Sequence, residues 1–110
     1  MEHILFKQKV KSEKIKEYIN AHKNAPQELL NAMKNSGLNN MIIWIDGCEL
    51  YLYAIADNFD GAYAKLVMTE VFQKWLTIMT PLLDEVQDYS EEGKIQKLNK
   101  IFDIEAQLKD

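Results

Sequence analysis

The stretch that decides the fold is residues 41–56, which read MIIWIDGCELYLYAIA. Two segments dense in apolar, β-branched and aromatic residues flank a short turn that contains Asp46-Gly47. An Asp-Gly pair between two such segments is a strong signal for a β-hairpin. We therefore predict two antiparallel strands, residues 41–45 and residues 50–56. Successive side chains point to opposite faces of a strand, and both faces are apolar here, so both need to be covered.

Two further strands are predicted outside the hairpin. Residues 4–10 alternate between apolar and polar, and the inner row of this strand includes one polar side chain, Gln8, which needs a hydrogen-bond partner in the protein or in a ligand. Residues 98–104 also alternate, and we expect a last strand there. The side chains expected to face inward from it are Leu98, Phe102 and Ile104. The acidic stretch 84–93 is interpreted as a loop.

A first helical region is predicted between the first strand and the hairpin. Ser12 can cap it, and an apolar stripe with helical spacing follows. Pro26 lacks an amide hydrogen and disfavours helical geometry in the residue before it, so we expect a break near Asn24 and Ala25. The helix should then resume and end at Asn35-Ser36-Gly37. The members of the first stripe are Ile15, Tyr18, Ile19 and His22.

A second helical region is predicted after the hairpin. Asn58 or Asp60 can open it, and Thr69 offers a fresh cap for a second segment. Pro81 helps to end that segment. The order strand, helix, strand, strand, helix, strand predicts one domain over residues 1–110 with an α+β fold, the ferredoxin-like βαββαβ sandwich. Its helices should cover one face of the sheet, and the same face of a second copy should cover the other in a two-fold homodimer.

Composition excludes several classes of partner. The formal net charge is −4 and the lysines are scattered, whereas nucleic-acid binding needs clustered positive charge. A single cysteine, Cys48, cannot form an internal disulfide and suits a reducing compartment. The longest uninterrupted apolar run, residues 41–45, is too short to span a bilayer, and no signal-peptide pattern is present. We therefore expect a cytoplasmic protein without nucleic-acid or membrane partners.

The candidate site begins with Tyr18 and His22, which are four residues apart and should project side by side from a helix. The ordinary pKa of histidine lies close enough to neutrality for proton transfer. The plain alternative is a hydrogen-bonded histidine at the edge of the core. Composition favours a core position for Trp44 and Trp75, and an aromatic platform for a sugar ring is the other use of such a side chain. No second His or Cys lies at metal-ligand spacing from His22.

Several separated elements carry a resemblance to a known family. From Phe6 to Ile104 the chain resembles the L-rhamnose mutarotase family, with the acidic stretch as the weakest part. The elements that match in order and spacing are Glu17-Tyr18-x-x-x-His22, Glu28-Leu29, Lys34-x-x-Gly37, Asn40, Ile43-x-x-Asp46 and Gln73-Lys74-Trp75-x-x-x-Met79.

This resemblance implies a dimeric ferredoxin-like isomerase that interconverts the α and β anomers of a 6-deoxy aldose such as L-rhamnose or L-fucose, without cofactor or metal. It implies that His22 is the proton donor and that Tyr18 and Trp75 contact the sugar. Two positions depart from the family pattern. Met41 stands where a sugar-binding tyrosine is common, and Leu76 stands where a second tryptophan usually follows the first. These departures bear on the identity of the sugar more than on the reaction.

Several alternatives remain open at this point. Ring opening needs a base that takes the anomeric hydroxyl proton and an acid that protonates the ring oxygen. Glu28, Asp57 or a bound water could complement His22. A non-catalytic sugar-binding or regulatory module of the same fold is the second hypothesis, motivated by Met41 and Leu76. A small oxidoreductase is the third, and fold-level analogy is its only support.

Overall fold

The computed structural model describes residues 1–84 and 97–108. Three strands form an antiparallel sheet in the order β1-β3-β2, with β3 in the centre. Their bounds are β1 Glu2–Lys9, β2 Leu38–Asp46 and β3 Glu49–Ala56. The predicted hairpin is confirmed, because Asp46 pairs with Glu49 across the turn and Gly47 adopts a positive φ of 60°. Glycine adopts such a left-handed conformation without steric cost.

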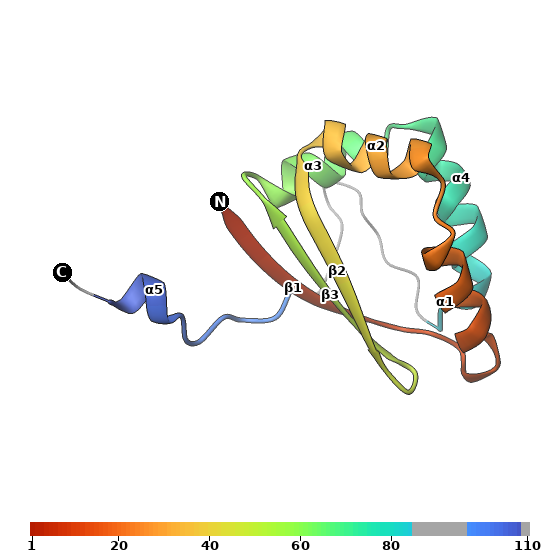
Figure 1. The fold of residues 1–110 in the computed structure, drawn as a ribbon, viewed down its shortest axis with the longest axis horizontal. Helices are drawn as coiled ribbons and strands as arrows, with labels where there is room; N and C mark the ends of the chain where they lie inside the picture. Colours follow the sequence, from red (N-terminus) through yellow and green to blue (C-terminus); the bar gives the residue numbers. More distant parts are fainter. Residues whose placement is uncertain (85–96, 109–110) are drawn as a thin grey trace.

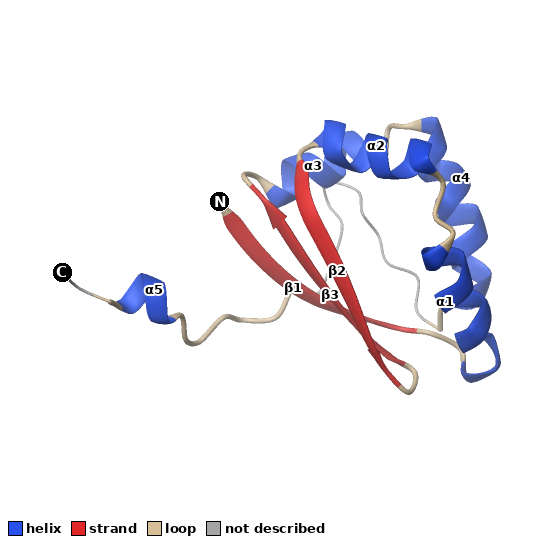
Figure 2. Cartoon of the chain, viewed as in Figure 1, coloured by secondary structure: helices blue, strands red, loops and turns tan. Residues whose placement is uncertain are grey.

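The helices lie on one face of this sheet, except the last one, which lies apart from the sheet (Figures 1 and 2). In chain order they are η1 Ser12–Lys14, α1 Ile15–Lys23, α2 Gln27–Ser36, α3 Phe59–Leu66, α4 Glu70–Met79, η2 Thr80–Leu82 and α5 Ile104–Gln107. Apolar side chains from the inner face of the sheet meet those of α1 to α4 and form one core. The largest fully buried ones are Phe6, Phe59, Leu38, Leu50, Leu66 and Val10. No helix among the described residues is long and apolar enough to cross a membrane.

Most of the predicted helix boundaries are confirmed. The break occurs at Pro26, between α1 and α2. Asn58 caps α3 by accepting a hydrogen bond from the amide of Gly61, and Thr69 caps α4 by accepting one from the amide of Phe72. Gly37, with a φ of 120°, ends α2. Caps and helix stops depend on residues within one turn of the helix end, so they can be predicted without knowledge of the tertiary structure.

The prediction that Ser12 caps the first helix is wrong. The chain begins this region with the short 3-10 turn η1, and neither η1 nor α1 has a side-chain cap. The Ser12 hydroxyl instead donates to the neighbouring carboxylate of Glu13 at 3.2 Å. A cap would require the Ser12 oxygen to accept a hydrogen bond from a backbone amide of the first turn, and neither η1 nor α1 has such a bond.

The predicted strand over residues 98–104 is also wrong. From residue 97 onward, the described part of the chain meets β1 at an isolated bridge between Phe6 and Lys97 and at a hydrogen bond from the amide of Leu98 to the carbonyl of Leu5 (2.8 Å). Beyond that point the chain leaves the sheet, and Asp103 caps the short helix α5. The side chains expected to face inward, Leu98, Phe102 and Ile104, are exposed. Of the loop predicted over 84–93, all but the first residue lies outside the described residues.

Candidate active site

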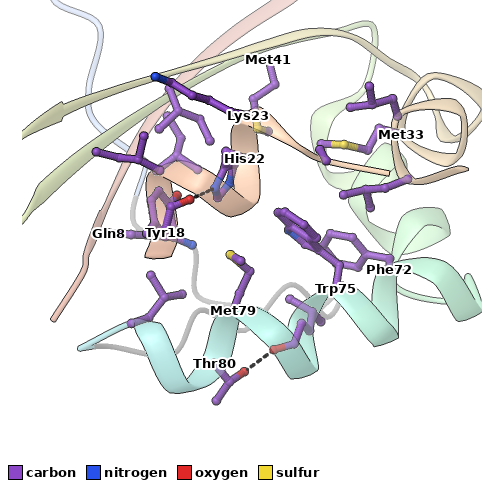
Figure 3. Close-up of a pocket in the computed structure, with 18 of the residues that line it drawn as sticks. Gln8, Tyr18, His22, Lys23, Met33, Met41, Phe72, Trp75, Met79 and Thr80 are labelled. Carbon is purple, nitrogen blue, oxygen red and sulfur yellow. Dashed lines mark hydrogen bonds between the residues drawn. The ribbon is translucent and has the colours of Figure 1, made fainter. Parts of the chain in front are cut away.

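A cavity of about 480 Å³ lies between the inner face of the sheet and helices α1, α2 and α4 (Figure 3). Its size falls within the range of small-molecule pockets. Most of its wall is apolar, and the polar groups are few. The strands and α3 contribute Gln8, Met41, Ile43, Ile45, Leu52 and Tyr63; the first two helices contribute Tyr18, Ile19, His22, Lys23, Leu29, Leu30 and Met33; α4 contributes Phe72, Trp75, Leu76 and Met79.

Three of the predicted site residues meet in this cavity. Tyr18 and His22 lie one turn apart on α1, and their ring centroids are 4.2 Å apart. Trp75 reaches the same imidazole from α4, edge to face, with the centroids 5.1 Å apart. The histidine therefore lies between two aromatic rings from different helices (Figure 3).

A backbone contact determines the tautomer of His22. Its Nδ1 lies 2.9 Å from the carbonyl oxygen of Tyr18. A carbonyl oxygen can only accept a hydrogen bond, so Nδ1 carries the proton and donates. In the neutral ring Nε2 is then an unprotonated acceptor, and no described residue bonds to it.

The environment of His22 also sets its charge. Burial lowers the pKa of His22 from the ordinary 6.5, and the hydrogen bond to the Tyr18 carbonyl offsets only part of this effect. The charged form is disfavoured because the apolar wall solvates it poorly. At neutral pH the imidazole is therefore predominantly neutral, with a basic nitrogen on the side of the ring away from the helix backbone.

Both positions that depart from the family pattern line the cavity. Met41 lies on β2, where its sulfur accepts a hydrogen bond from the hydroxyl of Tyr63 at 3.8 Å. Leu76 follows Trp75 on α4. Tyr63 also lines the cavity and was not among the predicted site residues. Its position depends on the packing of α3 against β3 and α2, which no local pattern reveals.

The inner position of Gln8 on β1 is confirmed. Its side chain is buried and lines the cavity beside Tyr18 in Figure 3. A buried amide has to be satisfied by hydrogen bonds, and a cavity position leaves it able to engage a ligand as well.

The prediction that Trp44 belongs to the core is wrong. Its side chain lies on the outer face of the sheet, where it stacks on Tyr53 at a centroid distance of 6.4 Å and stays largely exposed. The strand period explains this, since Met41, Ile43 and Ile45 take the inner face of β2 and leave Trp44 outside.

Neither of the carboxylates considered as partners of His22 lines the cavity. Glu28 and Asp57 are both exposed at other places on the surface. Lys23 is the one Lys, Arg, Asp or Glu among the described residues that line this cavity, and it is exposed. Within residues 1–84 and 97–108, no three His, Cys, Asp or Glu side chains gather as a metal site would require.

Comparison with known proteins shows the family to which the chain belongs. The chain matches the family model for L-rhamnose mutarotase over residues 3–104, which confirms the resemblance seen in the spaced motifs. No curated protein matches the chain.

Solved structures show the fold. An L-rhamnose mutarotase from Formosa agariphila is 21% identical, with a TM-score of 0.73 over 93% of this chain and 97% of that one. An antibiotic biosynthesis monooxygenase is 11% identical, with a TM-score of 0.61 over 90% and 97%. A conserved protein from Methanosarcina mazei Go1 is 16% identical, with a TM-score of 0.61 over 90% and 91%. The predicted ferredoxin-like α+β class is confirmed by these likenesses.

Proposed function

The chain belongs to the L-rhamnose mutarotase family of carbohydrate isomerases, and we propose that it interconverts the α and β anomers of a 6-deoxy aldose such as L-rhamnose, with His22 as the group that transfers the proton. The observation that carries the role of His22 is the contact of its Nδ1 with the Tyr18 carbonyl, which leaves Nε2 as the ring nitrogen available to a ligand in a sugar-sized cavity.

The first step of the proposed reaction uses His22 as a base. Nε2 takes the proton of the anomeric hydroxyl, the bond between the anomeric carbon and the ring oxygen breaks, and the ring oxygen takes a proton from a water molecule, which is left as hydroxide. No described carboxylate lines the cavity, which supports water as the second proton carrier. The sugar is now an open-chain aldehyde, and His22 is an imidazolium.

The second step reverses the proton transfers on the other face of the aldehyde. After rotation about the bond next to the carbonyl carbon, the ring hydroxyl attacks the opposite face and returns its proton to the hydroxide, which becomes water again. His22 donates its proton from Nε2 to the former carbonyl oxygen. The resemblance to the family implied that His22 is a proton donor, and in this scheme His22 acts as the donor in the second step. Positioned acid-base groups of this kind contribute roughly 10²–10⁴-fold to a rate.

We propose that Tyr18 and Trp75 contact the sugar. An indole face is suited to the apolar C–H face of a pyranose, and Trp75 lies beside the histidine that would act on the anomeric centre. The apolar side chains of Met41 and Leu76 line the same cavity and suit a methyl group better than a hydroxymethyl group. This supports a 6-deoxy sugar as the substrate class.

We further propose that the protein is a cytoplasmic homodimer. The face of the sheet opposite the helices is here called the outer face. Its apolar or aromatic side chains are Leu5, Ile42, Trp44, Tyr51, Tyr53 and Ile55. Contiguous apolar surface of this kind is a common mark of an interface, and a two-fold axis would place it against its own copy. The lone Cys48 suits a reducing compartment.

A binding-only module is the second candidate function. It is favoured by the position of Met41 and Leu76 in the cavity wall, since replacement of a hydroxyl and an indole there removes two potential sugar contacts.

Exchange NMR on anomeric protons separates the two candidates. The wild-type protein should accelerate α/β exchange for at least one 6-deoxy aldose in a panel that pairs each 6-deoxy sugar with its hydroxymethyl counterpart. A sugar that binds without acceleration would establish the binding module instead. Acceleration that is equal for both members of every pair would contradict the 6-deoxy preference.

A further inference from the structure

The inner row of β1 contains one amide among apolar side chains. Its members are Ile4, Phe6, Gln8 and Val10. Phe6 and Val10 are fully buried, and Gln8 is only 4% exposed. Burial of an amide is unfavourable unless hydrogen bonds replace those that it made with water, so an apolar residue would suit this row better. Residues that break the pattern of their own element are concentrated at functional sites.

The backbone around Gln8 is held from both sides. On one side Gln8 pairs with Leu50 of β3. On the other side the carbonyl of the next residue, Lys9, accepts a hydrogen bond from the amide of Asp84 at 2.8 Å. Because the position along a strand decides the face to which a side chain points, these contacts hold the Gln8 side chain in the wall of the cavity.

This amide lies at the end of the cavity that holds His22. Figure 3 shows Gln8, Tyr18 and His22 at this end, with Phe72 and Met33 at the opposite end. The position is relevant because the anomeric hydroxyl and the ring oxygen of a cyclic sugar are bonded to the same carbon. A carrier of the second proton therefore has to lie close to the histidine that handles the first.

The proposed reaction makes a specific demand on this end of the cavity. Water gives its proton to the ring oxygen and is left as hydroxide, next to a wall that is mostly apolar. An anion in such surroundings is unfavourable unless hydrogen-bond donors point to it. Two hydroxyls of the wall already donate elsewhere. Thr80 donates to the carbonyl of Leu76 at 2.7 Å, and Tyr63 donates to the sulfur of Met41 at 3.8 Å.

The amide of Gln8 has the chemistry that this demand requires. It carries two N–H donors and a carbonyl oxygen with two lone pairs, so its interaction within the protein leaves capacity for a further partner. The carbonyl can accept a hydrogen bond from water, and an N–H group can donate one to hydroxide. An amide does not titrate near neutral pH, so it holds both forms without competing for the proton. Gln8 is the one side-chain amide among the described residues that line the cavity.

We propose that the amide of Gln8 holds the water that serves as the second proton carrier. The role rests on the proposed isomerase function and makes Gln8 a positioning residue, which acts through the water and not on the sugar itself. In ring opening an O–H bond of the water breaks as its proton passes to the ring oxygen, and the remaining hydroxide accepts a hydrogen bond from the Gln8 amide. In reclosure the hydroxide takes the proton of the attacking hydroxyl and is water again.

The matched pair Gln8→Met and Ile4→Met tests this role. Methionine is a flexible, unbranched side chain without an N–H donor, and Ile4 lies in the same row of β1 without lining the cavity. In exchange NMR at varied sugar concentration, we expect Gln8→Met to lower kcat by about tenfold or more and to leave KM within about twofold. Such a loss is part of the roughly 10²–10⁴-fold that positioned acid-base groups contribute. Ile4→Met should keep the wild-type values of both.

Chemical rescue separates the function of the amide from its packing. Gln8→Ala leaves space in the cavity wall for a small molecule. Acetamide in the buffer should restore part of the lost kcat, whereas acetone, which has nearly the same shape but no N–H donor, should not. Both additives are compared on the same variant, so a change in its folding cannot account for a difference between them.

The outcomes are distinguishable from those for the isomerase. Wild-type kcat in Gln8→Met would overturn the role of Gln8. A raised KM at unchanged kcat would also overturn it and would make Gln8 a direct contact of the sugar. An equal loss of kcat in Ile4→Met, or equal rescue by acetone, would reduce Gln8 to a packing role. Each of these results leaves the isomerase in place, whereas a wild-type protein that accelerates exchange for no sugar would overturn both.

Discussion

The Nδ1 atom of His22 and the carbonyl oxygen of Tyr18, one helical turn earlier, lie 2.9 Å apart. This contact makes the backbone of α1 the acceptor of one ring proton, so the other ring nitrogen is the one available to a ligand. The same turn places the Tyr18 ring against the imidazole, with the ring planes tilted by 36°. A single turn of helix therefore sets the tautomer, the orientation and part of the apolar surroundings of the histidine.

We expect the rate of anomer exchange to fall as the pH is lowered through the pKa of His22. Burial lowers this pKa below the ordinary 6.5, and the proposed reaction begins from the neutral imidazole. The rate should therefore be level near neutral pH and drop on the acid side, below 6.5. Exchange NMR at pH values from about 4.5 to 8, with a parallel titration of the histidine ring proton, checks this. A rate that rises on acidification would contradict the basic role of Nε2.

The same shift predicts a pH dependence of stability. The folded-state pKa of His22 lies below its unfolded value, so the unfolded chain binds more protons in the window between the two. The contribution of His22 to the free energy of unfolding should thus be intact above about 6.5 and be lost as the pH falls toward the folded pKa. Urea unfolding of the wild type and of His22→Gln across this window isolates the effect. Parallel curves for the two proteins would refute it.

Replacement of His22 by glutamine should slow anomer exchange by roughly 10²–10⁴-fold, because an amide can still form hydrogen bonds but cannot carry the proton. His3→Gln is the matched control, since His3 is the other histidine of the chain and lies on the exposed face of β1. Circular dichroism should show that both variants fold. Wild-type exchange in His22→Gln would remove this residue from the mechanism.

The two tryptophans should differ in their effect on sugar binding. Trp75→Leu removes the ring beside His22, and we expect sugar affinity to fall about two- to tenfold, in line with the ~0.5–1.5 kcal/mol of an aromatic contact. Trp44→Leu removes a ring on the outer face and should leave the affinity unchanged. Calorimetric titration with the sugar selected from the NMR panel measures both. Equal losses in the two variants would contradict the assignment of Trp75 to the sugar.

Helix capping gives a stability prediction with an internal control. Thr69 both accepts from the amide of Phe72 and donates to the carbonyl of Leu66 at 2.7 Å. Thr69→Ala should therefore lower the free energy of unfolding by about 1 kcal/mol. Ser12→Ala should have no measurable effect, since Ser12 contacts only an exposed carboxylate. Urea denaturation compares the two, and a larger loss from Ser12→Ala would mean that Ser12 caps a helix after all.

The sequence by itself determined the features that local physics controls. The Asp46-Gly47 turn, the break before Pro26 and the caps at Asn58 and Thr69 all depend on a few neighbouring residues. Turn conformation, ring closure in proline and hydrogen bonding to a free amide act over three or four positions. Helical spacing also placed Tyr18 beside His22 before any tertiary contact was known.

Only the tertiary structure decided what meets across the fold. Trp75 contacts His22 because α4 packs opposite α1, a relationship that the spacing within either helix does not contain. Residues 98–104 have the alternation of a strand yet leave the sheet, because alternation describes side-chain directions and does not supply a pairing partner. The Tyr18–His22 pair follows from the period of one helix, whereas the cavity that gives the pair a chemical role follows from the packing of several elements around it.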